Sequence, residues 1–180
     1  MEHALKQAAR EALLGSGLRR TPIDALTRAA GISKGSFYLL FPSKEALAVA
    51  VLKEAETTLR AELDAAAEGP EPLRAVLEHV FESVATHPML ALLRDPEELA
   101  WLTRSLPAGA LDAELADDAA WFGGLIERLR ARGVRVDLTG EELAGIGGVA
   151  LAIEQGRGLL GPARDAVVRR IVDGLLAVAG

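Results

Sequence analysis

Two serine–lysine pairs, Ser33-Lys34 and Ser43-Lys44, combine residue types that together bind anions. A serine that caps a helix stands at an end with about half a positive charge, where lysine is mildly disfavoured. A lysine kept at such an end adds an ammonium group to the backbone N–H donors, and together they suit a phosphate group. The two pairs therefore predict a site that holds two phosphates of one polyanion.

The helix between the two pairs must position them. Thr21 is predicted to cap a helix that ends at Gly31, and residues 33–40 are predicted to form the next one, barely two turns long. Isolated helices shorter than about 12–15 residues are marginal in water, so this helix must be clamped by its neighbours, with Phe37 inward. Two helices joined by a tight glycine turn form a helix-turn-helix, whose second helix enters the major groove of DNA.

The charge distribution supports a polyanion partner for the N-terminal third of the chain. The 180 residues carry a net charge of −6, but residues 1–54 hold eight basic and five acidic side chains, a net charge of +3. The remaining residues carry a net charge of −9. The basic part is predicted to bind nucleic acid, while the acidic remainder discourages indiscriminate binding of polyanions.

Helical periodicity runs through the whole chain. Strand-like alternation is limited to residues 134–136, which are too few to build a sheet. Glycine and proline punctuate the pattern, and Thr139 with Glu142 forms a capping box before a helix over 140–158. The sequence therefore predicts an all-α protein of eight or nine helices.

Residues 21–47, TPIDALTRAAGISKGSFYLLFPSKEAL, resemble the N-terminal DNA-binding region of the TetR family of transcriptional regulators. The resemblance implies about nine helices, with a helix-turn-helix DNA-binding domain over 1–46 and an effector-binding and dimerisation domain over 47–180. It also implies a ligand-responsive homodimer on a palindromic operator in double-stranded DNA, most simply a repressor that its effector releases. With the argument from the residues, the expected DNA contacts are Thr21, Ser33, Lys34, Gly35, Ser36, Tyr38 and Lys44.

Leu39 and Leu40 depart from the family pattern, which often has histidine, tyrosine or another polar residue at these two positions. The departure either removes a phosphate contact or deepens the packing. Because the outer edge of this helix also lacks Arg, Asn and Gln, base readout is expected to depend on Lys34, Ser36 and close approach of the backbone.

The last two predicted helices carry more apolar and small residues than one narrow core stripe needs. Such residues allow close helix packing, so an intermolecular four-helix bundle from residues 140–178 is expected to form the dimer. Burial within one subunit is the alternative. The predicted interface residues are Leu143, Ile146, Gly147, Ala150, Ile153, Val168, Ile171 and Leu175.

An effector pocket is predicted beside Trp121 and Phe122, because Gly123 and Gly124 follow them in the helix 109–132 and leave space there. Phe81, Met89 and Trp101 are expected to line the same pocket. These apolar side chains favour a largely apolar effector, lipid-like or an acyl thioester. Effector binding is expected to move the helix over 44–67 and so to change the separation of the two recognition helices.

The remaining sequence features argue against a metal-binding protein, an enzyme and a secreted or membrane protein. There is no cysteine, the three histidines are scattered without a carboxylate pattern, and no nucleophile–base pair or phosphate loop stands out, so no metal, no cofactor and no enzymatic activity are expected. The N-terminus lacks the apolar core of a signal peptide, and the longest uncharged apolar run, 143–153, is too short for a membrane span, so a cytoplasmic protein is expected. The alternative function is a helical ligand-binding or interaction protein that binds no operator.

Overall fold

The computed structural model describes residues 1–179, which form helices and loops with no strand among them. The chain divides into two compact units. Unit 1 comprises Met1–Thr58 and His87–Leu106, and unit 2 comprises Leu59–Thr86 and the chain from Pro107 onward. This division follows the packing of the backbone. The functional division into 1–46 and 47–180 stays a prediction.

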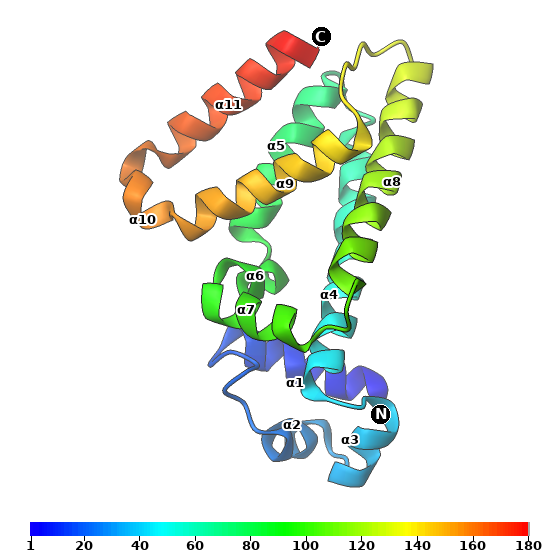
Figure 1. Ribbon diagram of the computed structural model, residues 1–180, viewed down its shortest axis with the longest axis vertical. Helices are drawn as coiled ribbons and strands as arrows, with labels where there is room; N and C mark the ends of the chain where they lie inside the picture. The colour runs from blue at the N-terminus through cyan, green and yellow to red at the C-terminus, as the bar shows by residue number, and fades with distance from the viewer. Residues whose placement is uncertain (180) are drawn as a thin grey trace. The chain divides into compact units, whose positions relative to one another are not determined.

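Unit 1 contains the N-terminal helices and a second, later segment of the chain. Its elements are α1 (Glu2–Leu14), α2 (Ile23–Ala30), α3 (Lys34–Leu40), the first part of α4 (Lys44–Ala66), the 3-10 helix η1 (Pro88–Leu90), α6 (Ala91–Arg94) and α7 (Pro96–Ser105). Helix α1 packs against α2, and α2 packs against α3 (Figure 1). The core between them contains Leu5, Leu26, Phe37 and Leu47, each fully buried. This core supplies the clamp that the short α3 needs.

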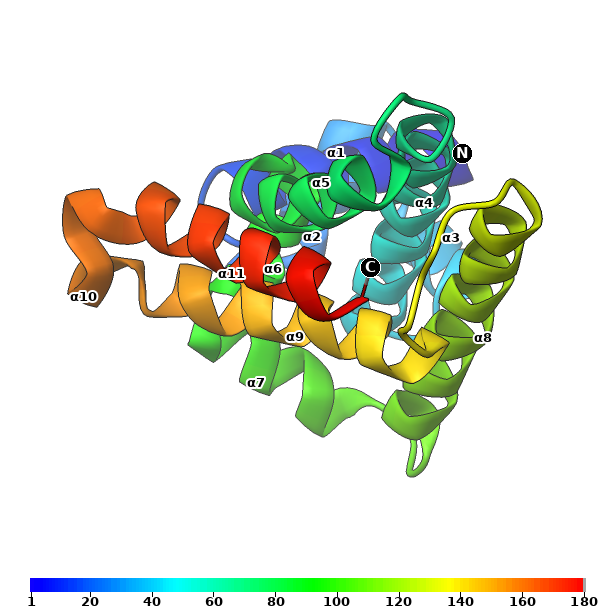
Figure 2. The same cartoon turned by 90° about the horizontal axis from the view of Figure 1, so that it is seen from above.

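Unit 2 is a bundle built around α9. Its elements are the end of α4, α5 (Pro72–Thr86), α8 (Ala110–Ala131), α9 (Gly140–Gln155), α10 (Arg157–Leu160), the 3-10 helix η2 (Gly161–Ala163) and α11 (Arg164–Ala179). Helix α9 packs against both α5 and α8, and α11 packs against α5 (Figure 2). Leu77, Phe81, Leu125 and Leu143 fill the core between these helices.

The start of α9 is fixed by local and long-range features. Thr139 and Glu142 form the predicted capping box. Gly140, the first residue of α9, approaches α8 so closely that a Cβ there would lie 2.1 Å from the Ala119 carbonyl oxygen and 2.6 Å from the Gly123 nitrogen. Only glycine fits this crossing. Gly123 therefore contributes to the contact of α8 with α9, and α8 continues through it unbroken.

The predicted all-α fold is confirmed, and the nine expected helices correspond to α1–α5, α7–α9 and α11. The structure adds short helical turns after His87 and after Gly156, where the sequence pattern predicts a turn and a continuous helix, respectively. Among the described residues no single helix is long and apolar enough to cross a membrane, whereas α3 and α4 meet that criterion only as a pair bent by 58°.

Candidate nucleic-acid interface

The turn between α2 and α3 has the geometry of a helix-turn-helix. Gly31 ends α2 in the left-handed conformation (φ 68°, ψ 31°), which glycine adopts without a steric cost. The Gly31 and Ile32 N–H groups donate to the carbonyls of Arg28 and Thr27, the pairing of a Schellman motif. Ser33 then caps α3, and its hydroxyl accepts a hydrogen bond from the Ser36 N–H at 3.0 Å. Only three residues, 31–33, separate the end of α2 from the start of α3, as the sequence predicts.

Helix α3 has one face in the core and one in solvent. Phe37 is completely buried, and Leu40 packs against the same core. The opposite face carries Gly35, Tyr38 and Leu39, of which Tyr38 is 51% and Leu39 88% exposed. Among the predicted DNA contacts, Ser33, Lys34, Gly35 and Tyr38 lie in the open, and Ser36 is half-buried at the edge.

Lys34 extends from the first turn of α3 toward α2. Its Nζ lies 3.0 Å from Oδ1 of Asp24, and both side chains are more than half exposed. The hydrogen bond to Asp24 raises the pKa of Lys34 above its ordinary value, so the side chain is fully charged at neutral pH. An exposed pair of this kind is weak, and a phosphate group can compete with Asp24 for the ammonium.

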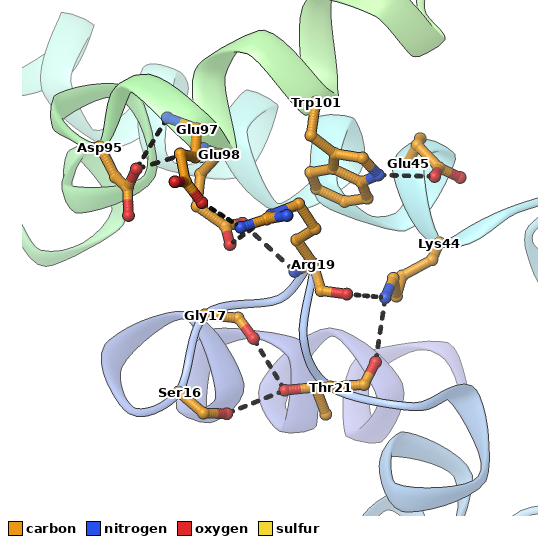
Figure 3. A network of polar contacts seen from close by, with 10 residues as sticks. All are labelled: Ser16, Gly17, Arg19, Thr21, Lys44, Glu45, Asp95, Glu97, Glu98 and Trp101. Atoms are coloured by element: carbon orange, nitrogen blue, oxygen red, sulfur yellow. Dashed lines mark hydrogen bonds and ion pairs between the residues drawn. The ribbon is translucent and has the colours of Figure 1, made fainter.

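Lys44, at the start of α4, has a different environment (Figure 3). Its Nζ donates to the carbonyl oxygens of Arg19, at 2.6 Å, and Thr21, at 3.1 Å, and lies 5.6 Å from the centre of the Trp101 ring. Burial lowers the pKa of Lys44 below its ordinary value. Lys44 therefore holds the loop before α2, a function that the sequence did not indicate. An ammonium has three donors and these carbonyls take two, so its contact with phosphate stays a prediction.

Thr21 does not cap α2, contrary to the expectation from sequence. Pro22 occupies the capping position, and the Thr21 hydroxyl donates instead to the Gly17 carbonyl at 2.8 Å, with the Ser16 hydroxyl 3.1 Å away. The Thr21 hydroxyl therefore makes its hydrogen bond within the loop that precedes α2 and does not cap the helix. Thr21 is half-buried, and its predicted contact with DNA is untested.

A buried carboxylate anchors the same loop to α7 (Figure 3). Asp95 caps α7 by accepting from the N–H groups of Glu97 and Glu98. Glu98, whose side chain is only 4% exposed, accepts from the Arg19 N–H at 3.2 Å and lies 3.7 Å from the Arg19 Nε. Glu97, on the exposed side, also pairs with the Arg19 guanidinium. Sequence reasoning missed this contact because Arg19 and Glu98 are far apart in the chain and carry no distinctive pattern.

The residues predicted to line one effector pocket belong to two hydrophobic clusters. Met89 and Trp101 lie in the cluster of unit 1, where the Trp101 ring N–H donates to Glu45 at 2.9 Å. Phe81, Trp121 and Phe122 lie in the cluster of unit 2, with the Trp121 and Phe122 rings edge to face, 5.0 Å between centroids. The pocket itself stays a prediction.

The predicted dimer residues lie largely on the inner side of their helices. Leu143, Ile146, Ala150 and Val168 are buried within the chain's own core. Ile153, Ile171 and Leu175 pack against that core while half-exposed, and Gly147 is half-exposed. On α9 the outer side carries Gly145, Gly148, Val149 and Ala152. The predicted contact between subunits is untested.

A clamped two-turn helix after a glycine turn defines a helix-turn-helix domain, the class of fold that places its second helix in DNA. Residues 5–51 match the family model of the bacterial regulatory proteins of the tetR family. The predicted resemblance to the TetR family is thus confirmed over the region that carries the helix-turn-helix. No significant match was found among curated proteins.

Solved structures extend the likeness to the whole chain. A TetR-family transcriptional regulator from Pectobacterium atrosepticum is 20% identical, with a TM-score of 0.71 over 98% of this chain and 91% of that one. The fatty acid degradation regulator FadR from Bacillus halodurans is 17% identical, with a TM-score of 0.68 over 97% and 94%. FadR from Bacillus subtilis, in complex with stearoyl-CoA, is 16% identical, with a TM-score of 0.63 over 97% of both chains. At these identities the likeness establishes the fold.

Proposed function

We propose that this protein is a dimeric, ligand-responsive transcriptional regulator that binds a pseudo-palindromic DNA operator through α3 and acts as a repressor. The observation that carries the proposal is the helix-turn-helix of residues 23–40. Its second helix is held by the buried Phe37, yet its outer face is open and lies beside an exposed lysine. The match of residues 5–51 to the tetR family supports the same function.

The proposal is tested by selecting DNA from a random pool with the purified protein in the presence of competitor DNA. We expect one enriched sequence with two-fold symmetry and half-sites about 34–36 Å apart, bound with an affinity that falls steeply with salt. Binding with no sequence preference, or none at all, would favour the alternative of a helical ligand-binding protein without an operator.

Lys34→Ala is expected to weaken operator binding and to lower the slope of log affinity against log salt by about 0.9 for each phosphate contact removed. The reason is that Lys34 stands fully charged at the exposed start of α3. The measurement is fluorescence anisotropy of labelled operator over a salt series. A slope unchanged from the wild type would show that Lys34 makes no phosphate contact.

Asp24→Asn is the matched variant for this test. It leaves Lys34 in place but removes the carboxylate that competes with phosphate for the ammonium. Operator affinity is therefore expected to rise, with a salt slope no smaller than that of the wild type.

Gly35→Ala separates folding from binding. A Cβ at Gly35 would meet only the Ser33 Oγ, at 3.7 Å, so the fold itself has room for alanine. Because alanine favours helix by up to about 1 kcal/mol over glycine, the free energy of unfolding is expected to stay the same or rise. Operator affinity is expected to fall, because the added methyl group would keep the α3 backbone from the groove. Urea denaturation measures the free energy of unfolding, and fluorescence anisotropy measures operator affinity.

Gly124→Ala is the control for Gly35→Ala. Gly124 is exposed in α8, and a Cβ there would meet only the end of the flexible Arg128 side chain. This variant is expected to be at least as stable as the wild type and to bind operator equally well. If Gly35→Ala also binds equally well, the α3 backbone does not approach DNA closely.

The outer side of α9 supports the homodimer. Gly145, Gly148, Val149 and Ala152 recur at intervals of three and four residues, so these small or apolar side chains form one continuous exposed stripe. A stripe of small residues lets a second helix approach closely. The proposed dimer would use this stripe together with the half-exposed Ile153 of α9 and Ile171 of α11. Light scattering of the free protein and of its operator complex tests the stoichiometry, which is expected to be two chains per operator.

The proposed effector is small and largely apolar. The Trp121–Phe122 ring pair supports an apolar site in unit 2, and the Bacillus subtilis regulator of similar fold was solved with stearoyl-CoA. Stearoyl-CoA is therefore the first probe, with coenzyme A and stearic acid as controls. A bound acyl chain is expected to change tryptophan fluorescence and to release the operator. Helix α4, whose first part belongs to unit 1 and whose end belongs to unit 2, is the proposed moving element.

A further inference from the structure

Leu39 is an aliphatic side chain on the outward face of α3, 88% exposed. Single exposed leucines are common on protein surfaces, so exposure alone says little. The position is what distinguishes Leu39. Gly35 lies one turn earlier on the same face, and the buried Phe37 and half-buried Leu40 point to the other side. Leu39 therefore stands on the surface that α3 turns away from the protein, near the C-terminal end of this helix.

Gly35 permits close approach at this surface. Nothing in the chain requires a glycine there, since a Cβ would make only an ordinary contact with Ser33. Gly35 lies near the start of the exposed face of α3 and has no side chain, so the α3 backbone can come close to a surface that this face contacts. If the backbone lay close to the floor of the major groove, a four-carbon side chain one turn further along would reach the edges of the bases.

The chemistry of Leu39 restricts what it can recognise. It has no donor or acceptor, so it cannot read the polar edges of guanine, adenine or cytosine. The 5-methyl group of thymine is the apolar group that base pairs present in the major groove. We propose that Leu39 is a specificity-determining residue that packs on a thymine methyl group in each half-site of the operator. This inference rests on the proposed function and deepens it.

The test uses the selected operator with each thymine replaced in turn by deoxyuridine, symmetrically in both half-sites. Deoxyuridine lacks only the methyl group, so base pairing and charge are unchanged. Burial of one methyl-sized group corresponds to about a fourfold change in affinity, or about fifteenfold for two half-sites. We expect the wild type to lose this factor at one symmetric pair of positions.

Leu39→Ala should bind the thymine operator as weakly as the wild type binds the deoxyuridine operator. Its affinity should not fall further when that thymine is replaced by deoxyuridine. Because Leu39 is exposed, this variant is expected to fold normally, which urea denaturation checks. Leu159→Ala, at a leucine of α10 that is 94% exposed, is the control and should keep the full thymine dependence.

The outcomes separate this inference from the proposed function. Selected binding in which no thymine methyl group matters, or in which Leu39→Ala keeps the wild-type dependence on it, overturns the role of Leu39 alone. If the protein selects no DNA sequence, the proposed function fails, and the inference fails with it.

Discussion

Arg164→Ala is expected to lower the free energy of unfolding by about 3–5 kcal/mol, the cost of breaking a buried ion pair by removing one partner. Arg164 begins α11, and its side chain is only 10% exposed. Its Nε and Nη2 lie 2.7 and 2.6 Å from Oε1 of Glu154, a carboxylate 1% exposed near the end of α9. Without Arg164, Glu154 would keep only the exposed Arg157 as a cationic partner among the described residues.

The loss is measured by urea denaturation, with Arg169→Ala as the matched control. Arg169 lies on the same helix but is exposed, so its removal is expected to have little effect. The double variant Glu154→Leu with Arg164→Met removes both charges and keeps similar volumes. It should recover most of the lost stability, because apolar replacement of a whole buried pair is often neutral. A double variant as unstable as Arg164→Ala would contradict the explanation by an unpaired buried charge.

Glu98→Ala is expected to lower the free energy of unfolding by about 1–3 kcal/mol, the cost of leaving a buried hydrogen-bonding group without its partner. The Arg19 N–H would lose its acceptor and the Arg19 guanidinium its buried counter-ion. Operator binding is also expected to weaken. The reason is that Lys44 donates to the carbonyls of Arg19 and Thr21. The loop before α2, which contains both carbonyls, therefore connects the start of α4 to the start of α2.

Glu97→Ala provides the comparison. Glu97 pairs with the same arginine, but its side chain is 72% exposed, and surface pairs contribute little. Urea denaturation and anisotropy at a temperature where both variants are folded should show a clear loss for Glu98→Ala and almost none for Glu97→Ala. Glu98→Gln, which keeps an acceptor for the Arg19 N–H but no charge, should lie between them. Equal effects of Glu97→Ala and Glu98→Ala would rule out a special role for the buried carboxylate.

These two pairs have the same origin in the fold. The first pair joins α11 to α9, and the second joins the loop before α2 to α7. In each pair a carboxylate is buried by another segment of the chain. Nothing in the residue types distinguishes Glu98 from Glu97, since both occupy the first turn of α7 as helix-favouring acids. Only the position of the loop with Arg19 buries one and leaves the other in solvent.

Much of the helix-turn-helix could be predicted because its determinants are local. Gly31 ends α2, Ser33 caps α3, and Ser43 caps α4 by accepting from the Ala46 N–H. Each depends on a hydrogen bond between residues a few positions apart, which the spacing in the sequence already specifies. The same holds for the capping box of Thr139 and Glu142. The expectation that Thr21 caps α2 was wrong, because its hydroxyl donates instead to the carbonyl of Gly17 in the preceding loop.

The sequence by itself determined the helical class, the order of the main helices and the short helix α3, because helix starts, helix ends and apolar periodicity are set over one or two turns of chain. Tertiary structure alone decided which charges are buried. It also decided that Gly123 rather than Gly124 lies where α8 crosses α9, and that Lys44 holds the loop before α2. Those properties arise from contacts between distant segments, and their energies depend on burial and distance, which residue types in order do not encode.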